Sequence, residues 1–326
     1  MIHHLVQVGV LGNLSGTDLG GFFVRFDRRW LVAACLGMVV LVVFAWLEAG
    51  DSEMSPAEAL LLGVVEGVTE FLPISSTGHL TVTNELLRLT EMPDAEAAAD
   101  AYSIVIQAGA IIAVVGIYRT RVTTAVLAIA GKGPDVDAGR RLLAALIGGF
   151  APAAVIGLTF EDFIKSRLFG IWPVVTAWIV GGIVILLWKR TDGHRPLETL
   201  GLREGLIIGC AQAIAMWPGT SRSLVTILAA LALGYTMSAA VEFAFLLGLV
   251  TLGAATVYEA LGSAGIIVDQ FGVLSPLLGF AAAFVSAAIA VKWMVAYLQT
   301  RSLAIFGWYR IAIGVVVGAL ALAGVV

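Results

Sequence analysis

Charged residues are scarce in this chain: of its 326 residues only 13% are Asp, Glu, Lys or Arg, whereas 60% are hydrophobic. A soluble domain carries about 25% charged residues. A water-soluble fold of this composition would have too few polar residues to cover its surface, so the scarcity of charge excludes an ordinary soluble domain. It indicates a protein that folds in a lipid bilayer.

Cysteines and basic clusters are scarce as well. The two cysteines, Cys35 and Cys210, lie in apolar stretches without CxxC or metal-ligand spacing, so we interpret both as small core residues. The net charge is −4, and the sequence has no basic tract of the kind that nucleic-acid binding requires. Nucleic acid is therefore excluded as a partner.

Long apolar runs, by contrast, recur along the whole chain. Seven of them are long enough to span a bilayer or nearly so. They cover roughly residues 30–48, 101–118, 142–158, 171–188, 238–260, 274–296 and 304–326. Two further apolar regions, 58–90 and 204–234, are broken in the middle by Pro, Gly, Ser and Thr. The sequence predicts an all-α polytopic membrane protein.

Basic loop residues predict its orientation, because Lys and Arg are enriched in cytoplasmic loops. Three arginines precede the first run and place the N-terminus in the cytoplasm, and the loops 119–141 and 189–204 are also basic. The remaining loops alternate between the two sides of the membrane only if neither broken region crosses it. Region 58–90 must then enter the membrane and return on the outside, and region 204–234 must do so on the inside. We therefore predict two opposed re-entrant helix hairpins, whose tips meet near the midplane.

The two broken regions resemble each other. Residues 63–71 match 209–217, with a glycine at each start and an aromatic residue at each end. A one-residue deletion after this match aligns Ser76 with Ser221. Similar segments in opposite orientations predict an inverted repeat, an architecture that places a site at the interface of its halves.

Two parts of the chain are predicted from these patterns. Residues 1–54 form an extension with one extra transmembrane helix; a signal peptide is the alternative, but no clear small-x-small cleavage site follows the apolar run. Residues 55–326 form a membrane domain of six core transmembrane helices and the two hairpins. Its repeat halves cover about 55–160 and 170–326.

Two of the acidic residues in the first broken region lie just before its break. Glu66 and Glu70 are four residues apart and therefore share one helix face. Carboxylates at membrane depth are costly and face a cavity or a partner. Both are candidates to hold a divalent cation, Mg²⁺ or Ca²⁺, or to accept protons. The alternative is a structural pair near the outer surface.

Hydroxyl groups and one arginine gather where the second half of each broken region begins. Ser75 and Ser76 occupy this position in the first region, and Ser221 and Ser223 in the second. N-capping explains one hydroxyl per helix start but not a cluster that includes Arg222. Two helix N-termini aimed at one point form an anion site, and a guanidinium suits phosphate oxygens. A buried arginine also requires an anion, either a carboxylate of the chain or a ligand phosphate.

Three further polar residues are open to interpretation. His79 follows Ser76 by three residues and is a candidate for catalysis, with a structural role as the alternative. Gln107, inside an apolar run, either contacts the site or bonds another helix. Glu242 is interpreted as a charge at the inner end of its span.

Two motifs resemble those of a known family. EGVTEFLPISSTGHL, at residues 66–80, resembles the first signature of the undecaprenyl-pyrophosphate phosphatase family of the bacitracin-resistance type, and PGTSRSLVT, at 218–226, resembles its second. The resemblance covers about 55–326. It departs at Leu224 and Val225, where the family usually has Gly-Ala.

The resemblance implies hydrolysis of a C55 polyprenyl pyrophosphate to the monophosphate, on the outer side of the plasma membrane, with a divalent cation. This reaction recycles a lipid carrier for cell-envelope synthesis. The functional residues that it carries over are Glu66, Glu70, Ser76, His79, Ser221, Arg222 and Thr226.

The working hypothesis is that Ser76 attacks the terminal phosphorus, with His79 or Glu70 taking its proton. A rival makes His79 the nucleophile. The phosphates are bound by Ser75 and by the second motif, through Ser221, Arg222, Ser223 and Thr226. Membrane lipids surround the chain, and a homodimer is left open. The alternative function is a polyprenyl-phosphate transporter built on the same inverted repeat; a purely structural scaffold would leave Arg222 and the carboxylates without a purpose.

Overall fold

The computed structural model describes residues 54–87, 89, 95–189, 193–271 and 274–326, and the secondary structure of this part of the chain consists of helices apart from one isolated bridge between Arg195 and Tyr235. The predicted all-α class is therefore confirmed. The predicted span 30–48 and nearly all of the predicted extension 1–54 lie outside the described residues.

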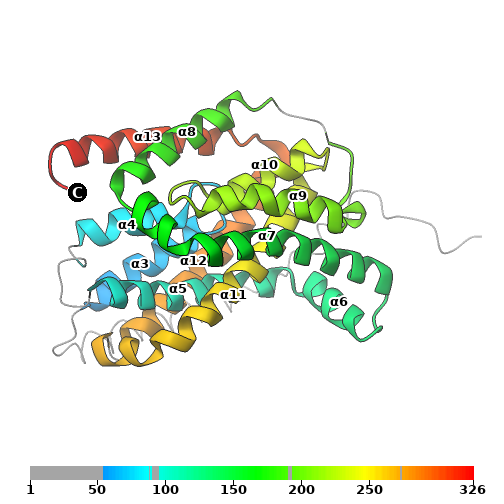
Figure 1. Ribbon diagram of the computed structural model, residues 1–326, viewed down its shortest axis with the longest axis horizontal. Coiled ribbons are helices and arrows are strands. Elements are labelled where there is room, and N and C mark those ends of the chain that lie inside the picture. The colour runs from blue at the N-terminus through cyan, green and yellow to red at the C-terminus, as the bar shows by residue number, and fades with distance from the viewer. Residues whose placement is uncertain (1–53, 88, 90–94, 190–192, 272–273) are drawn as a thin grey trace, which may run out of the picture.

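The helices follow the predicted apolar segments (Figure 1). The first group is α3 (Pro56–Thr69), α4 (Ser76–Leu86), α5 (Ala95–Ile117), α6 (Arg119–Ile129), α7 (Val136–Leu168) and α8 (Ile171–Leu187). The second group is η2 (Leu197–Thr199), α9 (Leu202–Gln212), η3 (Ala213–Met216), α10 (Arg222–Ala232), α11 (Met237–Phe271), α12 (Leu274–Thr300) and α13 (Ala304–Leu322). Both regions predicted as broken are broken, α3 from α4 and α9 from α10.

Several helices have the length and composition of membrane spans. Among the described residues, four segments qualify alone: Val136–Phe160, Met237–Tyr258, Leu274–Thr300 and Ala304–Leu322. The α5–α6 pair, which bends by 84°, makes a fifth if it counts as one span, and α8 is apolar but shorter. Large apolar side chains on these helices, such as Leu158, Val257 and Val316, are exposed, as expected for a surface that lipid covers.

The segment 119–141 differs from the loop expected between two spans, because its first half forms α6. Ala125 and Ala128, three residues apart, are buried on one face of this helix, which packs against α7. The backbone carbonyl of Ala128 accepts a hydrogen bond from Arg140 Nε at 3.3 Å. In the sequence, the basic residues of this segment indicated a loop, whereas the spacing of Ala125 and Ala128 is that of a helix with one buried face.

The start and end of α3 follow from its sequence. Ser55 caps the helix and exchanges hydrogen bonds with Glu58 in a capping box, and Pro56 occupies the first turn, where its missing N–H costs nothing. The helix ends at Glu70, three residues before Pro73, which cannot continue it. The loop that leads to α4 thus begins where the helix must end.

Close glycine contacts hold the two broken segments. A Cβ on Gly63 of α3 would collide with the Gly279 carbonyl of α12, and a Cβ on Gly209 of α9 would collide with the Gly149 carbonyl of α7. Small residues allow helix backbones to approach this closely in membranes. Each broken segment therefore packs on a long helix from the other half of the chain (Figure 1).

The structure gives a different register between the two broken segments from the one predicted. The bounds of α10 are those of α4 shifted by 146 residues, from 76–86 to 222–232. The N-cap residues Ser75 and Ser221 have φ of 73° and 74°, and within the described residues no other non-glycine residue has positive φ. The same shift makes Ser75 the counterpart of Ser221, so the predicted alignment of Ser76 with Ser221 is wrong. That alignment matched Pro73 with Pro218. The N-cap backbone angles instead show that Ser75 and Ser221 are the equivalent residues.

Candidate active site

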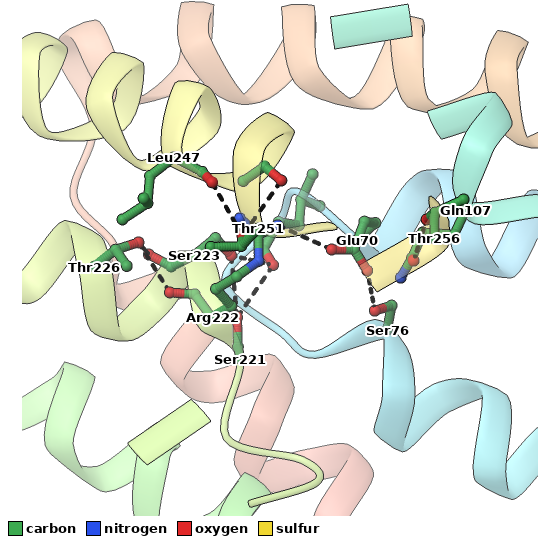
Figure 2. Close-up of polar contacts among 12 residues, drawn as sticks. Glu70, Ser76, Gln107, Ser221, Arg222, Ser223, Thr226, Leu247, Thr251 and Thr256 are labelled. Atoms are coloured by element: carbon green, nitrogen blue, oxygen red, sulfur yellow. Dashed lines mark hydrogen bonds and ion pairs between the residues drawn. The ribbon is translucent and has the colours of Figure 1, made fainter. Parts of the chain in front are cut away.

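Glu70 joins the two broken segments (Figure 2). It is the C-cap of α3, and its carboxylate is buried. Oε1 accepts a hydrogen bond from Arg222 Nη2 at 2.9 Å, and Oε2 accepts one from the Ser76 hydroxyl. The structure therefore brings three predicted site residues into one chain of contacts that runs from α10 through Glu70 to α4.

Arg222 is the first residue of α10, and its guanidinium is only partly used. Nη2 binds Glu70, whereas Nε and Nη1 are buried and have no hydrogen-bond partner among the described residues. The guanidinium lies 5.8 Å from the ring centroid of Phe71. A Cβ on Gly248 of α11 would collide with it, so this glycine provides its space. Two unused donors on a buried cation are suited to an anionic ligand.

The other hydroxyl groups of the second motif donate to backbone carbonyls. Ser223 Oγ binds the Leu72 carbonyl at 2.9 Å, and Ser221 Oγ lies 3.4 Å from the same atom. Thr226 Oγ1 binds the Arg222 carbonyl at 2.9 Å. Ser221 and Ser223 therefore hold α10 to the loop that precedes α4, whereas Thr226 bonds within α10. All three hydroxyl protons are donated to backbone carbonyls in this structure. Ser221 nevertheless contributes to the wall of the cavity.

His79 turns away from Ser76. Its Nδ1 lies 2.6 Å from the Ser75 carbonyl and its Nε2 lies 2.8 Å from the Tyr309 hydroxyl of α13. The ring packs between Trp178 and Tyr309, with centroid distances of 4.8 Å and 5.7 Å. Although residues 76 and 79 are neighbours along α4, the serine hydroxyl is directed to Glu70 and the imidazole to α8 and α13. The structure does not bring these two groups together.

Glu66 is buried one helical turn before Glu70. It is 1% exposed, and its Oε1 has no hydrogen-bond partner within the described residues. A buried carboxylate oxygen without a donor, one turn from a second carboxylate, fits a cation ligand. Among the described residues, however, no three or more His, Cys, Asp or Glu side chains cluster as a complete metal site. Any cation would therefore need further oxygen ligands, such as substrate or water.

A cavity of about 210 Å³ lies between the broken segments. Its polar wall includes Glu70, Ser75, Ser76, Thr77, Gln107, Gln212, Ser221, Arg222 and Thr251. Gln107 both lines the cavity and bonds another helix, because its Oε1 accepts a hydrogen bond from Thr256 of α11 at 2.9 Å. This contact leaves the amide N–H groups of Gln107 for the cavity. Both roles considered for Gln107 therefore apply.

Two residues outside the predicted site require comment. Glu242 forms an ion pair with Arg121 at 2.7 Å and is not part of the cavity wall. Arg310 of α13, which sequence reasoning missed, is fully buried and contacts the loops before α4 and α10. Its signal was an arginine inside an apolar run, which in membrane proteins marks a functional position by default.

Comparison with known proteins identifies the family of this chain. The family model "Bacitracin resistance protein BacA" matches residues 59–316. The chain is 43% identical over 274 residues to "Undecaprenyl-diphosphatase 2" of Rhodospirillum rubrum, which covers 82% of this chain and 96% of that protein. It is 42% identical over 263 residues to "Undecaprenyl-diphosphatase 1" of Chromobacterium violaceum, which covers 79% and 94%. Multiple apolar helices and these similarities show that the chain is a multi-pass membrane protein. The chain belongs to the family of the bacitracin resistance protein BacA.

Proposed function

We propose that this chain is a membrane phosphatase that hydrolyses undecaprenyl pyrophosphate to undecaprenyl monophosphate and phosphate, and so recycles the lipid carrier for cell-envelope synthesis. The observation that carries the proposal is the contact chain Arg222–Glu70–Ser76, which places a partly unused guanidinium and a carboxylate-bound hydroxyl beside one cavity. The names of the relatives from Rhodospirillum rubrum and Chromobacterium violaceum support it.

Serine attack is the mechanism that fits these contacts. Ser76 Oγ forms a bond to the terminal phosphorus, and its proton passes to Glu70, whose Oε2 already accepts it in a hydrogen bond. The bond between phosphorus and the bridging oxygen breaks, and the lipid leaves as the monophosphate. Water then hydrolyses the phosphoserine and releases phosphate. His79 is less suited to be the base, because its ring nitrogens contact Ser75 and Tyr309.

The phosphates are bound by N–H groups that have no acceptor within the described part of the chain. Nε and Nη1 of Arg222, the amide of Gln107 and the free backbone N–H groups at the starts of α4 and α10 surround the negative charge. The hydroxyls of Ser221 and Ser223 support this arrangement by binding the Leu72 carbonyl of the other loop, and the Thr226 hydroxyl supports it by binding the Arg222 carbonyl within α10. Ser75 contributes through the strained backbone that aims α4 at the cavity.

A divalent cation, Mg²⁺ or Ca²⁺, is part of the proposal and would be held by Glu66 and Glu70. When bound, it would neutralise charge on the transferred phosphoryl group. Replacing Glu66 with glutamine is expected to raise the cation concentration for half-maximal activity by about tenfold or more, because one anionic ligand is lost. The measurement is phosphate release during Mg²⁺ and Ca²⁺ titrations after chelation, with exposed Asp137→Asn as the matched control. An unchanged titration curve for Glu66→Gln would rule out this ligand.

The membrane arrangement in this proposal has six core spans, with α3–α4 and α9–α10 as opposed re-entrant hairpins of an inverted repeat. The N-terminus lies in the cytoplasm, and the site opens to the outside. Three observations support the repeat. The bounds of α4 and α10 differ by one constant shift, their N-cap serines match, and Gly63 and Gly209 each pack on a helix of the other half of the chain. A tag after α6 that is accessible only from outside the cell would contradict this arrangement. The homodimer stays a prediction.

Phosphate release from the solubilised chain separates the enzyme from the transporter. In detergent no compartments exist, so transport cannot produce a signal, whereas hydrolysis of undecaprenyl pyrophosphate still releases phosphate. We expect turnover with this substrate and less with short-chain pyrophosphates. Lipid movement in vesicles without phosphate release in detergent would favour the transporter instead.

A further inference from the structure

Arg310 is a buried cation whose hydrogen bonds within the described residues all go to backbone carbonyls. Its side chain is 0% exposed, and its Nη2 donates to the carbonyls of Ala177 and Gly219, each at 2.8 Å. Its Nη1 donates to the Pro73 carbonyl at 3.4 Å. Within the described part of the chain it has no acidic partner, and it is not part of the cavity wall. One guanidinium thus connects α8 with the loops that precede α4 and α10.

The two loop carbonyls are equivalent positions of the repeat. Pro73 and Gly219 are related by the same shift of 146 residues that relates α4 to α10. Each stands two residues before an N-cap serine with positive φ, Ser75 at 73° and Ser221 at 74°. Such backbone is costly and persists only where its surroundings hold it. Arg310 therefore holds the corresponding point of both strained loops.

The surrounding chain provides space for this guanidinium. A Cβ on Gly181 of α8 would collide with it. Gly219 has φ of 89°, a conformation that other residues rarely adopt, and a Cβ there would press on α8 at Val174. A planar group with five donors can satisfy carbonyls on three segments at once, which a lysine cannot do with the same geometry. Burying an unpaired charge costs free energy, so its presence here indicates that the guanidinium has a specific role.

The loop before α4 is held along its whole length. The four consecutive carbonyls of residues 72–75 each contact a side-chain nitrogen or hydroxyl. The partners are, in order, Ser223, Arg310, Trp178 and His79. Of these, Arg310 also binds a carbonyl of the loop before α10. These contacts leave the backbone fixed at the point where Ser76 begins α4.

We propose that Arg310 is a positioning residue that keeps Ser76 and Arg222 in alignment by holding both loops to α8. The proposal rests on the proposed phosphatase function. Loss of the guanidinium frees both loops, so that the hydroxyl and the phosphate-binding group no longer meet the substrate in one geometry. Misplacement of this kind lowers turnover more than binding.

The test compares Arg310→Met and Arg310→Lys with the control Arg301→Met, which removes an exposed arginine just before α13. In the solubilised full chain with undecaprenyl pyrophosphate, we expect Arg310→Met to lower kcat by about tenfold to hundredfold, with KM within about threefold of the unchanged protein. Arg310→Lys should be intermediate. Gly181→Ala, which only displaces the guanidinium, should lower kcat in the same direction if Arg310→Met does not fold.

Hydrogen exchange provides a readout that does not depend on activity. In the Arg310 variants, peptides that contain residues 72–76 and 219–222 should exchange faster, while those from α12 keep their rates. Unchanged exchange in either loop would overturn the inference whatever the activity. So would a kcat of Arg310→Met within about twofold of the unchanged protein, or a raised KM with unchanged kcat. If the unchanged protein released no phosphate while the variants showed altered loop exchange, the phosphatase function would be rejected. The role of Arg310 in holding both loops would still be supported.

Discussion

Replacing Arg222 with methionine is expected to lower kcat/KM by about 10³- to 10⁵-fold, as for other arginines that stabilise a transferred phosphoryl group. The side chain lines the cavity and has two buried donors that lack a partner among the described residues, and we propose that these donors bind the pyrophosphate. The substitution also leaves the Glu70 carboxylate buried without its ion-pair partner. Phosphate release from undecaprenyl pyrophosphate by the purified chain measures the effect.

Two further variants define what the arginine contributes. Arg222→Lys keeps the charge but loses the planar fork, so it should recover only part of the activity. Arg203→Met removes an exposed arginine from α9 of the same broken segment and should leave kcat/KM unchanged. If Arg222→Met kept more than about a tenth of the activity, the guanidinium would not be the phosphate ligand and the proposed site would be wrong.

Replacing Ser76 with alanine is expected to lower kcat by at least about 10³-fold, because the attacking oxygen is removed while the phosphate-binding groups remain. The variant keeps the backbone of α4, whose cap is the neighbouring Ser75. KM should change little, since Arg222 and the lipid chain bind the substrate. A matched control is Thr81→Ala, which removes another hydroxyl of α4 that binds only the backbone.

Trapping the phosphorylated protein decides between the two nucleophiles. Rapid quenching followed by peptide mapping should find phosphate on Ser76 and none in the Ser76→Ala variant. His79→Gln should keep the ability to form this intermediate, because His79 contacts Ser75 and Tyr309 rather than Ser76. Phosphate on His79, or near-normal turnover of Ser76→Ala, would replace the serine mechanism with its rival.

Much of the architecture follows from the sequence alone. A chain with so little charge must place its apolar surface in lipid, and the recurring apolar runs then become helices, because only helices satisfy backbone hydrogen bonds there without a partner strand. Pro73 and Pro218, with the serines that follow them, mark the breaks between α3 and α4 and between η3 and α10. The motif around Glu66, Glu70 and Ser76 also indicates its chemistry without coordinates.

Only the tertiary structure decided which hydroxyls are free and which residues are equivalent. Ser221, Ser223 and Thr226 look like phosphate ligands in the sequence, yet they donate to backbone carbonyls. The register of the repeat depends on N-cap backbone angles, which sequence letters do not record. His79 is separated from Ser76 by the direction of its side chain, which Tyr309 and Trp178 determine.

Arg310 shows the physical reason most clearly. In the sequence it is a single charge in the last apolar run, 237 residues from the Pro73 carbonyl that it binds. Whether a donor is used by the fold or left for a ligand depends on neighbours that are distant in the chain. Composition and local pattern therefore determined the membrane, the helices and the two broken segments, whereas the contacts that α8, α10 and α13 make with the two loops decided which polar groups the fold itself uses.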